Sequence, residues 1–569
     1  MGARLERVLL TVSGTLFAAL LSWILVSHAL APEDVAIVEI PSSWEPPEAA
    51  PSPEWDGPEA AAEGGRGEPR RQFNRGTALL RQGRNEEAVA AFEQALAIHP
   101  HYGEARFNLA LALGRVGRVD AAIEAYERVV EGDRSAWSAK SHYNLALLLS
   151  GRDRLREART ALDAALRLRP DFVKARYNRA LLLSRMELTH EAMEDYRKLL
   201  DLEPGHARAR MNFAALLLRE GNARAAREHL ERAVAEAPDD ARAHYRLGMC
   251  LARLDDDEGA AAALGRAVEL DPEYAEAFYN RGLAQQRVKD LAGAVQSFRR
   301  AVELRGGRAD YRYRLGLALA RSGDTESASE QYQEALLLRP GYYKALHALG
   351  LAHYRSEDYE AALQAFLEAR SARPESYDAA YNLGLTLLKL GRPAEAEERF
   401  RETLALEETT EAHYNHGLAL ARQDRPRDAM ESYRAALRID PKHARSIERL
   451  AEAHIEAGAH EEALARLTML QTLQPDDPTS YNAGLRLYRA DELRLAVRFF
   501  SVAAKGGESL RRKGLLMKGR ALAKLDDTDA ARETLTAALT EFPGDPAVES
   551  ELARVRKRAA PAPPAAPAP

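Results

Sequence analysis

The sequence has almost no cysteine: Cys250 is the only one among 569 residues. No disulfide can form within the chain, so a disulfide-stapled fold is excluded. A protein without disulfides can fold on either side of a membrane, which leaves the redox compartment open. Cys250 falls at an inner position of an expected helix, where a thiol packs as a small apolar side chain.

The sequence also lacks the short motifs of common catalytic sites. It has no P-loop, no HExxH, no nucleophile elbow and no CxxC. Lysine and arginine number 80 against 86 acidic residues, for a formal net charge of -6. A nucleic-acid-binding domain would be strongly basic. We therefore expect no enzyme activity, no cofactor, no metal site and no nucleic-acid partner.

Long uncharged runs are absent except for one, at 8–31. Its 24 residues exceed the roughly 20 that a helix needs to cross a bilayer. Arg4 and Arg7 precede the run, and Glu33 and Asp34 follow it. By the positive-inside rule, residues 1–7 are cytoplasmic and 8–31 form a single-pass signal anchor. The rest of the protein then lies on the periplasmic side of the inner membrane.

Two alternatives to this topology stay open. Ala29-Leu30-Ala31 offers a cleavage site for a secretory signal peptide, although the apolar run is long and Pro32 follows the site directly. An inverted anchor would instead leave a binding module facing the cytoplasm.

Segments poor in large apolar residues flank the bulk of the chain. Residues 32–68 alternate proline with acidic and small residues, and 559–569 contain only alanine and proline. Neither composition can bury enough apolar surface to fold. We predict a linker at 32–68 and a disordered tail at 559–569. Trp44 and Trp55 are unusual in such a linker and could dock on the folded part.

Between these segments the chain repeats itself. The stretch YNLGLTLLKLGRPAEAEERF at 381–400 has close relatives at 279–298 and 107–126. Aligned on a small residue, which we number position 8, the unit is mostly 34 residues long. Position 8 is occupied by Gly76, Ala110, Ala146, Ala180, Ala214, Gly248, Gly282, Gly316, Gly350, Gly384, Gly417, Ala451, Gly484 and Gly519.

Other positions of the unit are as regular. Position 20 is alanine in every repeat, and position 24 is always Phe, Tyr or Leu. Small residues at 8 and 20 let two antiparallel helices cross closely, and the larger residue at 24 fills the space between units. A glycine such as Gly391 stops the first helix, and a proline usually ends the unit. Such a pair of helices is stable only when stacked on others.

These repeats resemble the tetratricopeptide family, whose 34-residue period they share. The resemblance covers 69–545 and implies an all-α, right-handed solenoid of about 14 helix-turn-helix units. After it, Asp545 and Pro546 begin an expected capping helix at 546–558. Family membership implies a protein-binding scaffold whose first helices line a concave groove for extended segments of partner proteins.

Position 6 is asparagine in nine repeats, a row that could bond a peptide backbone. The row is similar to the asparagine ladder in the repeat half of O-linked N-acetylglucosamine transferases, but no catalytic half follows it. This resemblance favours an alternative, an accessory subunit of a polysaccharide or glycosylation machinery. Position 13 is basic in twelve repeats, which stabilises the end of a helix in any case.

Basic residues gather at position 2 of four consecutive repeats. In repeats four to six, Lys174, Asn178, Asn212, Arg242 and Arg246 resemble the carboxylate clamp of chaperone-binding tetratricopeptide domains, which binds the carboxyl terminus or the acidic side chains of a partner. The alternative is a solvated basic stripe. The candidate peptide-binding residues are Lys140, Asn144, Lys174, Asn178, Arg208, Asn212, Arg242 and Arg246. We expect a membrane-anchored scaffold that assembles an envelope complex.

Overall fold

The computed structural model describes residues 67–132 and 138–559. These residues form 29 helices and no strand. The predicted anchor at 8–31, its cytoplasmic end at 1–7, most of the linker and nearly all of the tail lie outside the described residues. The first helix begins at Gly67, two residues before the expected start of the repeats at 69, which is within the usual uncertainty of helix boundaries. None of the described helices is both long and apolar enough to span a membrane.

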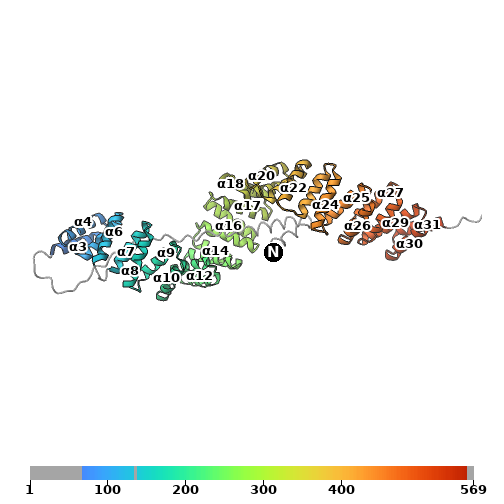
Figure 1. Cartoon of the computed structure of the whole chain (residues 1–569). Coiled ribbons are helices and arrows are strands. Elements are labelled where there is room, and N and C mark those ends of the chain that lie inside the picture. Colours follow the sequence, from blue (N-terminus) through green and yellow to red (C-terminus); the bar gives the residue numbers. More distant parts are fainter. Residues whose placement is uncertain (1–66, 133–137, 560–569) are drawn as a thin grey trace, which may run out of the picture. The chain divides into compact units, whose positions relative to one another are not determined.

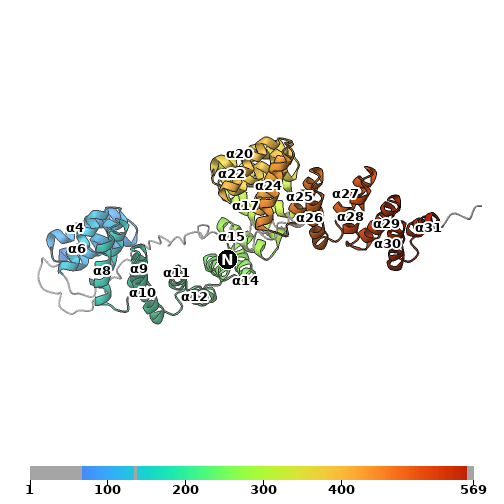
Figure 2. The same ribbon diagram turned by 45° about the vertical axis from the view of Figure 1, so that its right-hand side comes forward.

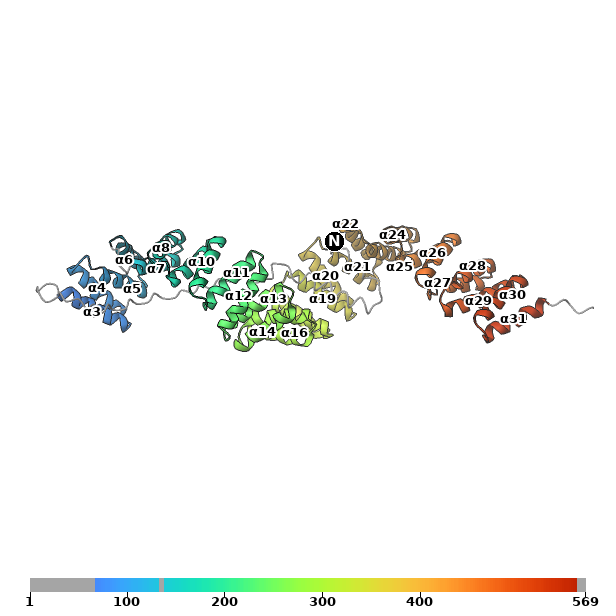
Figure 3. The ribbon, with the colours of Figure 1, turned by 90° about the horizontal axis from the view of Figure 1, so that it is seen from below.

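The protein divides into two compact units between Gly306 and Gly307. In each unit, helices pair as antiparallel hairpins that follow one another along the sequence (Figure 1). The same pairing is visible from two other directions (Figure 2, Figure 3).

The first unit contains seven hairpins. They are α3 (Gly67–Arg81) with α4 (Asn85–Ile98), α5 (Gly103–Arg115) with α6 (Val119–Gly132), α7 (Ser138–Gly151) with α8 (Leu155–Leu168), α9 (Val173–Arg185) with α10 (Thr189–Leu202), α11 (Ala207–Arg219) with α12 (Ala223–Glu236), α13 (Ala241–Arg253) with α14 (Asp257–Leu270), and α15 (Ala275–Arg287) with α16 (Leu291–Leu304).

The second unit contains seven hairpins and a final helix. They are α17 (Ala309–Ser322) with α18 (Thr325–Leu338), α19 (Tyr343–Arg355) with α20 (Tyr359–Ala372), α21 (Tyr377–Lys389) with α22 (Pro393–Leu406), α23 (Thr410–Ala421) with α24 (Pro426–Ile439), α25 (Ala444–Glu456) with α26 (His460–Leu473), α27 (Thr479–Arg489) with α28 (Leu493–Ala503), and α29 (Glu508–Lys524) with α30 (Thr528–Glu541), followed by α31 (Pro546–Ala559).

The small residues of the repeat lie where two helices cross. A Cβ added to Gly282 would stand 2.8 Å from the ring of Phe298, and Ala294 is fully buried. The residues at positions 20 and 24 are buried in every repeat, with no more than 2% of their surface exposed. The alanine pattern therefore marks the helix crossings, as the sequence predicts.

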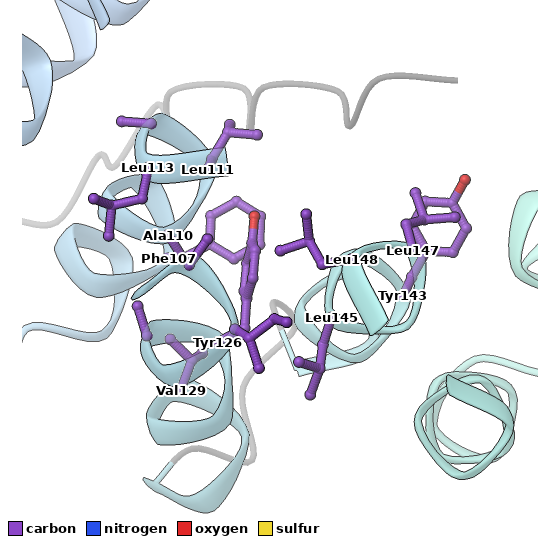
Figure 4. Close-up of a cluster of buried hydrophobic side chains, with 14 of the residues drawn as sticks. Phe107, Ala110, Leu111, Leu113, Tyr126, Val129, Tyr143, Leu145, Leu147 and Leu148 are labelled. Atoms are coloured by element: carbon purple, nitrogen blue, oxygen red, sulfur yellow. The ribbon is translucent and has the colours of Figure 1, made fainter. Parts of the chain in front are cut away.

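Side chains at position 24 also link one hairpin to the next. Phe107 on α5 and Tyr126 on α6 meet edge to face, with ring centroids 5.7 Å apart. Leu148 extends from α7 toward this pair, while Tyr143 and Leu147 lie on the opposite side of α7 (Figure 4). The core thus continues from one repeat into its neighbour.

The turn inside each hairpin needs a left-handed residue. Gly391 has φ 71°, and five other repeats use glycine at this place. The remaining eight repeats hold a non-glycine residue in the same region, such as Lys289 at φ 65°. All fourteen hairpins therefore turn in the same way, and glycine is favourable there without being required.

The last helix closes the second unit. Asp545 Oδ1 accepts hydrogen bonds from the amides of Ala547 (2.9 Å) and Val548 (3.1 Å), which caps α31. Val548, Leu552 and Val555 are buried on one side of α31. The helix covers the apolar surface that the final hairpin would otherwise expose.

Candidate functional site

The eight candidate residues lie on the first helices of four successive hairpins, at positions 2 and 6. We call this surface of α7, α9, α11 and α13 the basic A-helix face. Five of the eight positions carry a positive charge and none carries a negative one. Position 2 supplies Lys140, Lys174, Arg208 and Arg242, and position 6 supplies Asn144, Asn178, Asn212 and Arg246.

Hydrogen bonds between neighbouring first helices hold this face together. Asn178 Nδ2 donates to the Tyr143 hydroxyl at 3.0 Å, and Asn212 Nδ2 donates to the Tyr177 hydroxyl at 3.2 Å. Asn144 follows a repeat with phenylalanine at position 5, and it donates to the Tyr126 hydroxyl instead, at 3.0 Å. Each asparagine therefore fastens its helix to the preceding repeat.

The tyrosines at position 5 are the residues that sequence reasoning missed. The signal was present, because a tyrosine stands 34 or 35 residues before four of the nine asparagines at position 6. The same bond joins Asn280 to Tyr245 (3.2 Å) and Asn415 to Tyr381 (2.8 Å).

These bonds change what the asparagine row can offer to a ligand. Asn178 Nδ2 also donates to the carbonyl of Lys174 at 2.9 Å, so both of its amide hydrogens are committed within the protein. The carbonyl oxygen Oδ1 is then the atom with which Asn178 can meet a ligand, as an acceptor for a peptide N–H.

Asn212 and Arg246 are the two candidates that a direct hydrogen bond brings together. Arg246 Nη1 donates to Asn212 Oδ1 at 3.0 Å. Arg242 lies one turn earlier on α13 and is exposed, so both guanidinium groups can approach one ligand group. Lys174 and Arg208 are exposed on α9 and α11, Lys140 is half-buried on α7, and Asn144 is buried.

Arg246 has an unusual electrostatic environment. It is half-buried, and no carboxylate among the described residues lies within ion-pair distance of it. Burial lowers the pKa of Arg246, against the opposing effect of nearby tyrosines such as Tyr274 and Tyr177. A guanidinium removed from water without a counter-charge is costly, so an added carboxylate would stabilise it.

The basic face ends at the next first helix. Position 2 of α15 is Glu276, which forms an ion pair with Arg305. The run of basic residues at position 2 that begins on α7 therefore ends on α13.

The basic residues of position 13 have a different role. Arg115 Nη1 donates to the carbonyl of Leu80 at 3.3 Å, and Arg422 Nη1 donates to that of Leu388 at 2.5 Å. Each cation thus satisfies a carbonyl at the end of the preceding first helix. These contacts support the structural interpretation of that row.

The second unit repeats the same positions with a different charge. On α21, α23 and α25, positions 2 and 6 hold two acids and two arginines, so their charges cancel. Arg449 corresponds to Arg246, but it pairs with Glu452 at 2.8 Å. We call these residues the neutral set; they are Asp378, Asn382, Glu411, Asn415, Arg445 and Arg449.

One member of the tyrosine row is replaced by histidine. His347 Nε2 lies 3.0 Å from Asn382 Nδ2, and its ring stacks on Tyr343. Burial lowers the pKa of His347, and Asp378 partly opposes this shift. Since the folded pKa is below the unfolded value of about 6.5, the neutral form stabilises the fold above that pH, and the contribution is lost below it.

We therefore expect acidification from pH 7.5 to pH 5 to lower the opening free energy of α19 and α21, measured by hydrogen exchange relative to intrinsic exchange rates, by up to about 1.4 kcal/mol per pH unit below about pH 6.5. His347→Tyr should remove most of this dependence, after correction for intrinsic exchange rates. Local exchange is the required measurement, because burial also lowers the pKa of His413, His416 and His454 in the same unit. An unchanged pH dependence in His347→Tyr would contradict the assignment.

Among the described residues, no group of three or more His, Cys, Asp or Glu side chains could hold a metal ion. Cys250 is buried, its thiol donates to the carbonyl of Ala223 at 3.4 Å, and burial raises its pKa to about 11. The thiol is therefore a packing group with little thiolate character at neutral pH.

Tetratricopeptide repeat models match most of the sequence. One matches residues 73–138, 143–207, 258–309, 279–345, 313–377 and 347–413. Others match 186–245, 217–280 and 420–486, and 513–545. The protein belongs to the tetratricopeptide repeat family, as the sequence predicts.

Solved structures of other repeat proteins are similar to parts of this one. YrrB, described as a TPR protein with an unusual peptide-binding site, is 27% identical over 33% of this chain and 97% of its own, with a TM-score of 0.31. MamA from Desulfovibrio magneticus RS-1 is 25% identical over 30% of this chain and 96% of its own (TM-score 0.29). Pseudomonas aeruginosa pilF is 23% identical over 39% of this chain and 98% of its own (TM-score 0.32). The comparison with curated proteins found no match.

Proposed function

We propose that this protein is a non-catalytic scaffold whose basic A-helix face binds extended, acidic segments of partner proteins. One observation carries the proposal. Arg246 is a half-buried cation, and among the described residues its guanidinium donates a hydrogen bond to the neutral amide oxygen of Asn212, at 3.0 Å. A carboxylate from a ligand would supply the missing counter-charge, and Arg242 would contact the same group from one turn away.

The rest of the face suits an extended ligand. The exposed cations Lys174 and Arg208 continue the positive charge along the repeats, and they would attract further acidic side chains. Asn178 Oδ1 would accept from a backbone N–H, since its own amide hydrogens are committed. A ligand that crosses several repeats therefore meets cations and an acceptor in turn.

Binding of labelled peptides tests this function. We would titrate the full-length protein in detergent with a fluorescein-labelled peptide of alternating Glu and Ser, and with its Gln-for-Glu counterpart, each with a free or an amidated C-terminus. We expect the acidic peptides to bind. Rising salt should weaken this binding, because charges are screened over about 8 Å at physiological ionic strength. Equal binding of the Glu and Gln peptides with amidated ends would overturn the proposal.

The free and amidated ends separate two sources of the carboxylate. If the peptide with the free C-terminus binds more tightly than the amidated one, Arg242 and Arg246 recognise the carboxyl terminus of a partner. Equal binding would assign them to acidic side chains. Both results support recognition of a carboxylate.

We further propose that residues 8–31 anchor the scaffold in the inner membrane, with the repeats on the periplasmic side. Arg4 and Arg7 before the span support this orientation. In bacterial envelopes, a scaffold so placed would assemble a membrane-associated complex.

An alkaline phosphatase fused after Pro569 should therefore be active in intact bacterial cells, and the fusion should sediment with the membranes. A cytoplasmic reporter at the same place serves as the control. Activity of that reporter alone would contradict the orientation. A soluble product that begins near Pro32 would indicate a cleaved signal peptide.

A further inference from the structure

A strongly acidic segment of the protein itself stands immediately before the first repeat. Residues 32–66 hold nine acidic residues and one basic residue, Arg66. The acidic residues are Glu33, Asp34, Glu39, Glu45, Glu48, Glu54, Asp56, Glu59 and Glu63. We propose that this segment is the resident occupant of the basic A-helix face and competes there with partner segments, an inference that rests on the proposed function.

Charge complementarity supports this choice of occupant. The acidic segment has a formal charge of -8, and the basic face carries five cations with no acidic residue at its eight positions. The neutral set of the second unit would not attract the segment in this way, because two acids there balance two arginines. An anionic lipid surface would repel the segment, so the membrane is a less suitable partner for it.

The length of the segment also fits. Its frequent prolines favour polyproline II, which extends by about 3.1 Å per residue. Trp55 and Trp44 precede Gly67 by 12 and 23 residues, or about 37 and 71 Å of extended polypeptide. Five repeats separate α3 from α13, about 40–50 Å at a helix spacing of 8–10 Å. The segment that contains both tryptophans can therefore reach every cation of the basic face.

Tethering makes such an occupant effective even when its affinity is modest. A short flexible connection gives an effective concentration on the order of 1 mM. If the segment alone binds with a dissociation constant near 100 μM, the face is about 90% occupied, and a free peptide binds about tenfold more weakly than to an empty face. The bound segment would compete with weakly binding acidic proteins for the basic A-helix face, and a partner of higher affinity would displace it.

Tryptophan fluorescence tests the occupancy directly. The four tryptophans of the protein are Trp23, Trp44, Trp55 and Trp137, all outside the described residues. In the full-length protein with Trp23→Phe and Trp137→Phe, emission reports the acidic segment alone. We expect Trp44 and Trp55 to be protected from acrylamide at low salt, and exposed by high salt or by Arg242→Glu. Arg445→Glu, at the same position in the neutral set, should leave them protected.

Peptide binding separates this inference from the proposed function. In a second full-length variant, Glu45→Gln, Glu48→Gln, Glu54→Gln and Asp56→Asn neutralise the segment. The Glu-Ser peptide should bind this variant about tenfold more tightly than it binds the wild-type protein. Equal affinity for both, with tryptophans open to acrylamide, would overturn the resident occupant and leave the proposed function intact. No binding to either protein would overturn both.

Discussion

Arg246→Met should weaken binding of the acidic peptide by about 10- to 100-fold, which is about 1.4–2.8 kcal/mol. Methionine keeps much of the apolar volume beside Tyr177 and Tyr274, so the local packing should survive. The charge that a ligand carboxylate would meet is lost. Truncating one member of a desolvated charge pair typically costs 2–5 kcal/mol, and the half-buried position of Arg246 places it toward the lower part of that range.

The neutral set supplies the matched control. Arg449 occupies the position of Arg246 in the second unit, next to an asparagine at position 6 of the preceding repeat. It is already paired with Glu452 at 2.8 Å, so Arg449→Met should change peptide affinity by less than twofold. Fluorescence anisotropy of the labelled peptide measures both variants. Equal losses of peptide affinity in the two variants would contradict a specific site at repeats four to six. Nonspecific electrostatic attraction to basic residues would then explain the binding.

The contrast between these two arginines marks a limit of prediction from sequence. Arg246 and Arg449 follow the same pattern of basic residues at positions 2 and 6, but only the first belongs to the predicted clamp. What separates them is Glu452, three residues along the helix from Arg449, and the absence of any carboxylate within ion-pair distance of Arg246 among the described residues. The spacing of Arg449 and Glu452 is readable in the sequence, but only side-chain geometry shows that no carboxylate from another helix forms an ion pair with Arg246.

The fold was more predictable than the site. A close helix crossing tolerates only small side chains. Every repeat therefore has alanine at position 20 and glycine or alanine at position 8, and this pattern is visible in the sequence. Hydrogen bonding between repeats leaves a weaker trace. Asn178 could bind a ligand with either end of its amide, and the position of Tyr143 one repeat earlier decides which end remains. That choice depends on how hairpins stack, which composition and spacing do not reveal.

A buried ion network between repeats three and four should be the most sensitive electrostatic feature of the first unit. Asp195 on α10 has a side chain only 3% exposed. It accepts two hydrogen bonds from Arg179, both of 2.6 Å, and lies 3.5 Å from Arg176 Nη1. Removing one partner of a buried pair leaves the other charge uncompensated and typically costs 3–5 kcal/mol. Asp195→Ala should therefore destabilise α9 and α10 by about 3 kcal/mol.

Hydrogen exchange is the measurement, because contacts in a repeat array are between neighbours and the damage should stay near repeat four. A loss of about 3 kcal/mol corresponds to exchange more than about 100-fold faster in α9 and α10, with little change in the second unit.

Asp163 provides the control for this network. It contacts the same guanidinium, at 2.7 Å from Arg179 Nη1, but its side chain is 38% exposed. Water can replace it, so Asp163→Ala should cost no more than about 1 kcal/mol. Replacing Asp195 and Arg179 together, with Asp195→Leu and Arg179→Met, should recover part of the stability lost in Asp195→Ala, since Arg176 is then the one arginine of the network left without its carboxylate. If Asp195→Ala and Asp163→Ala exchanged equally fast, burial would not govern the strength of these ion pairs.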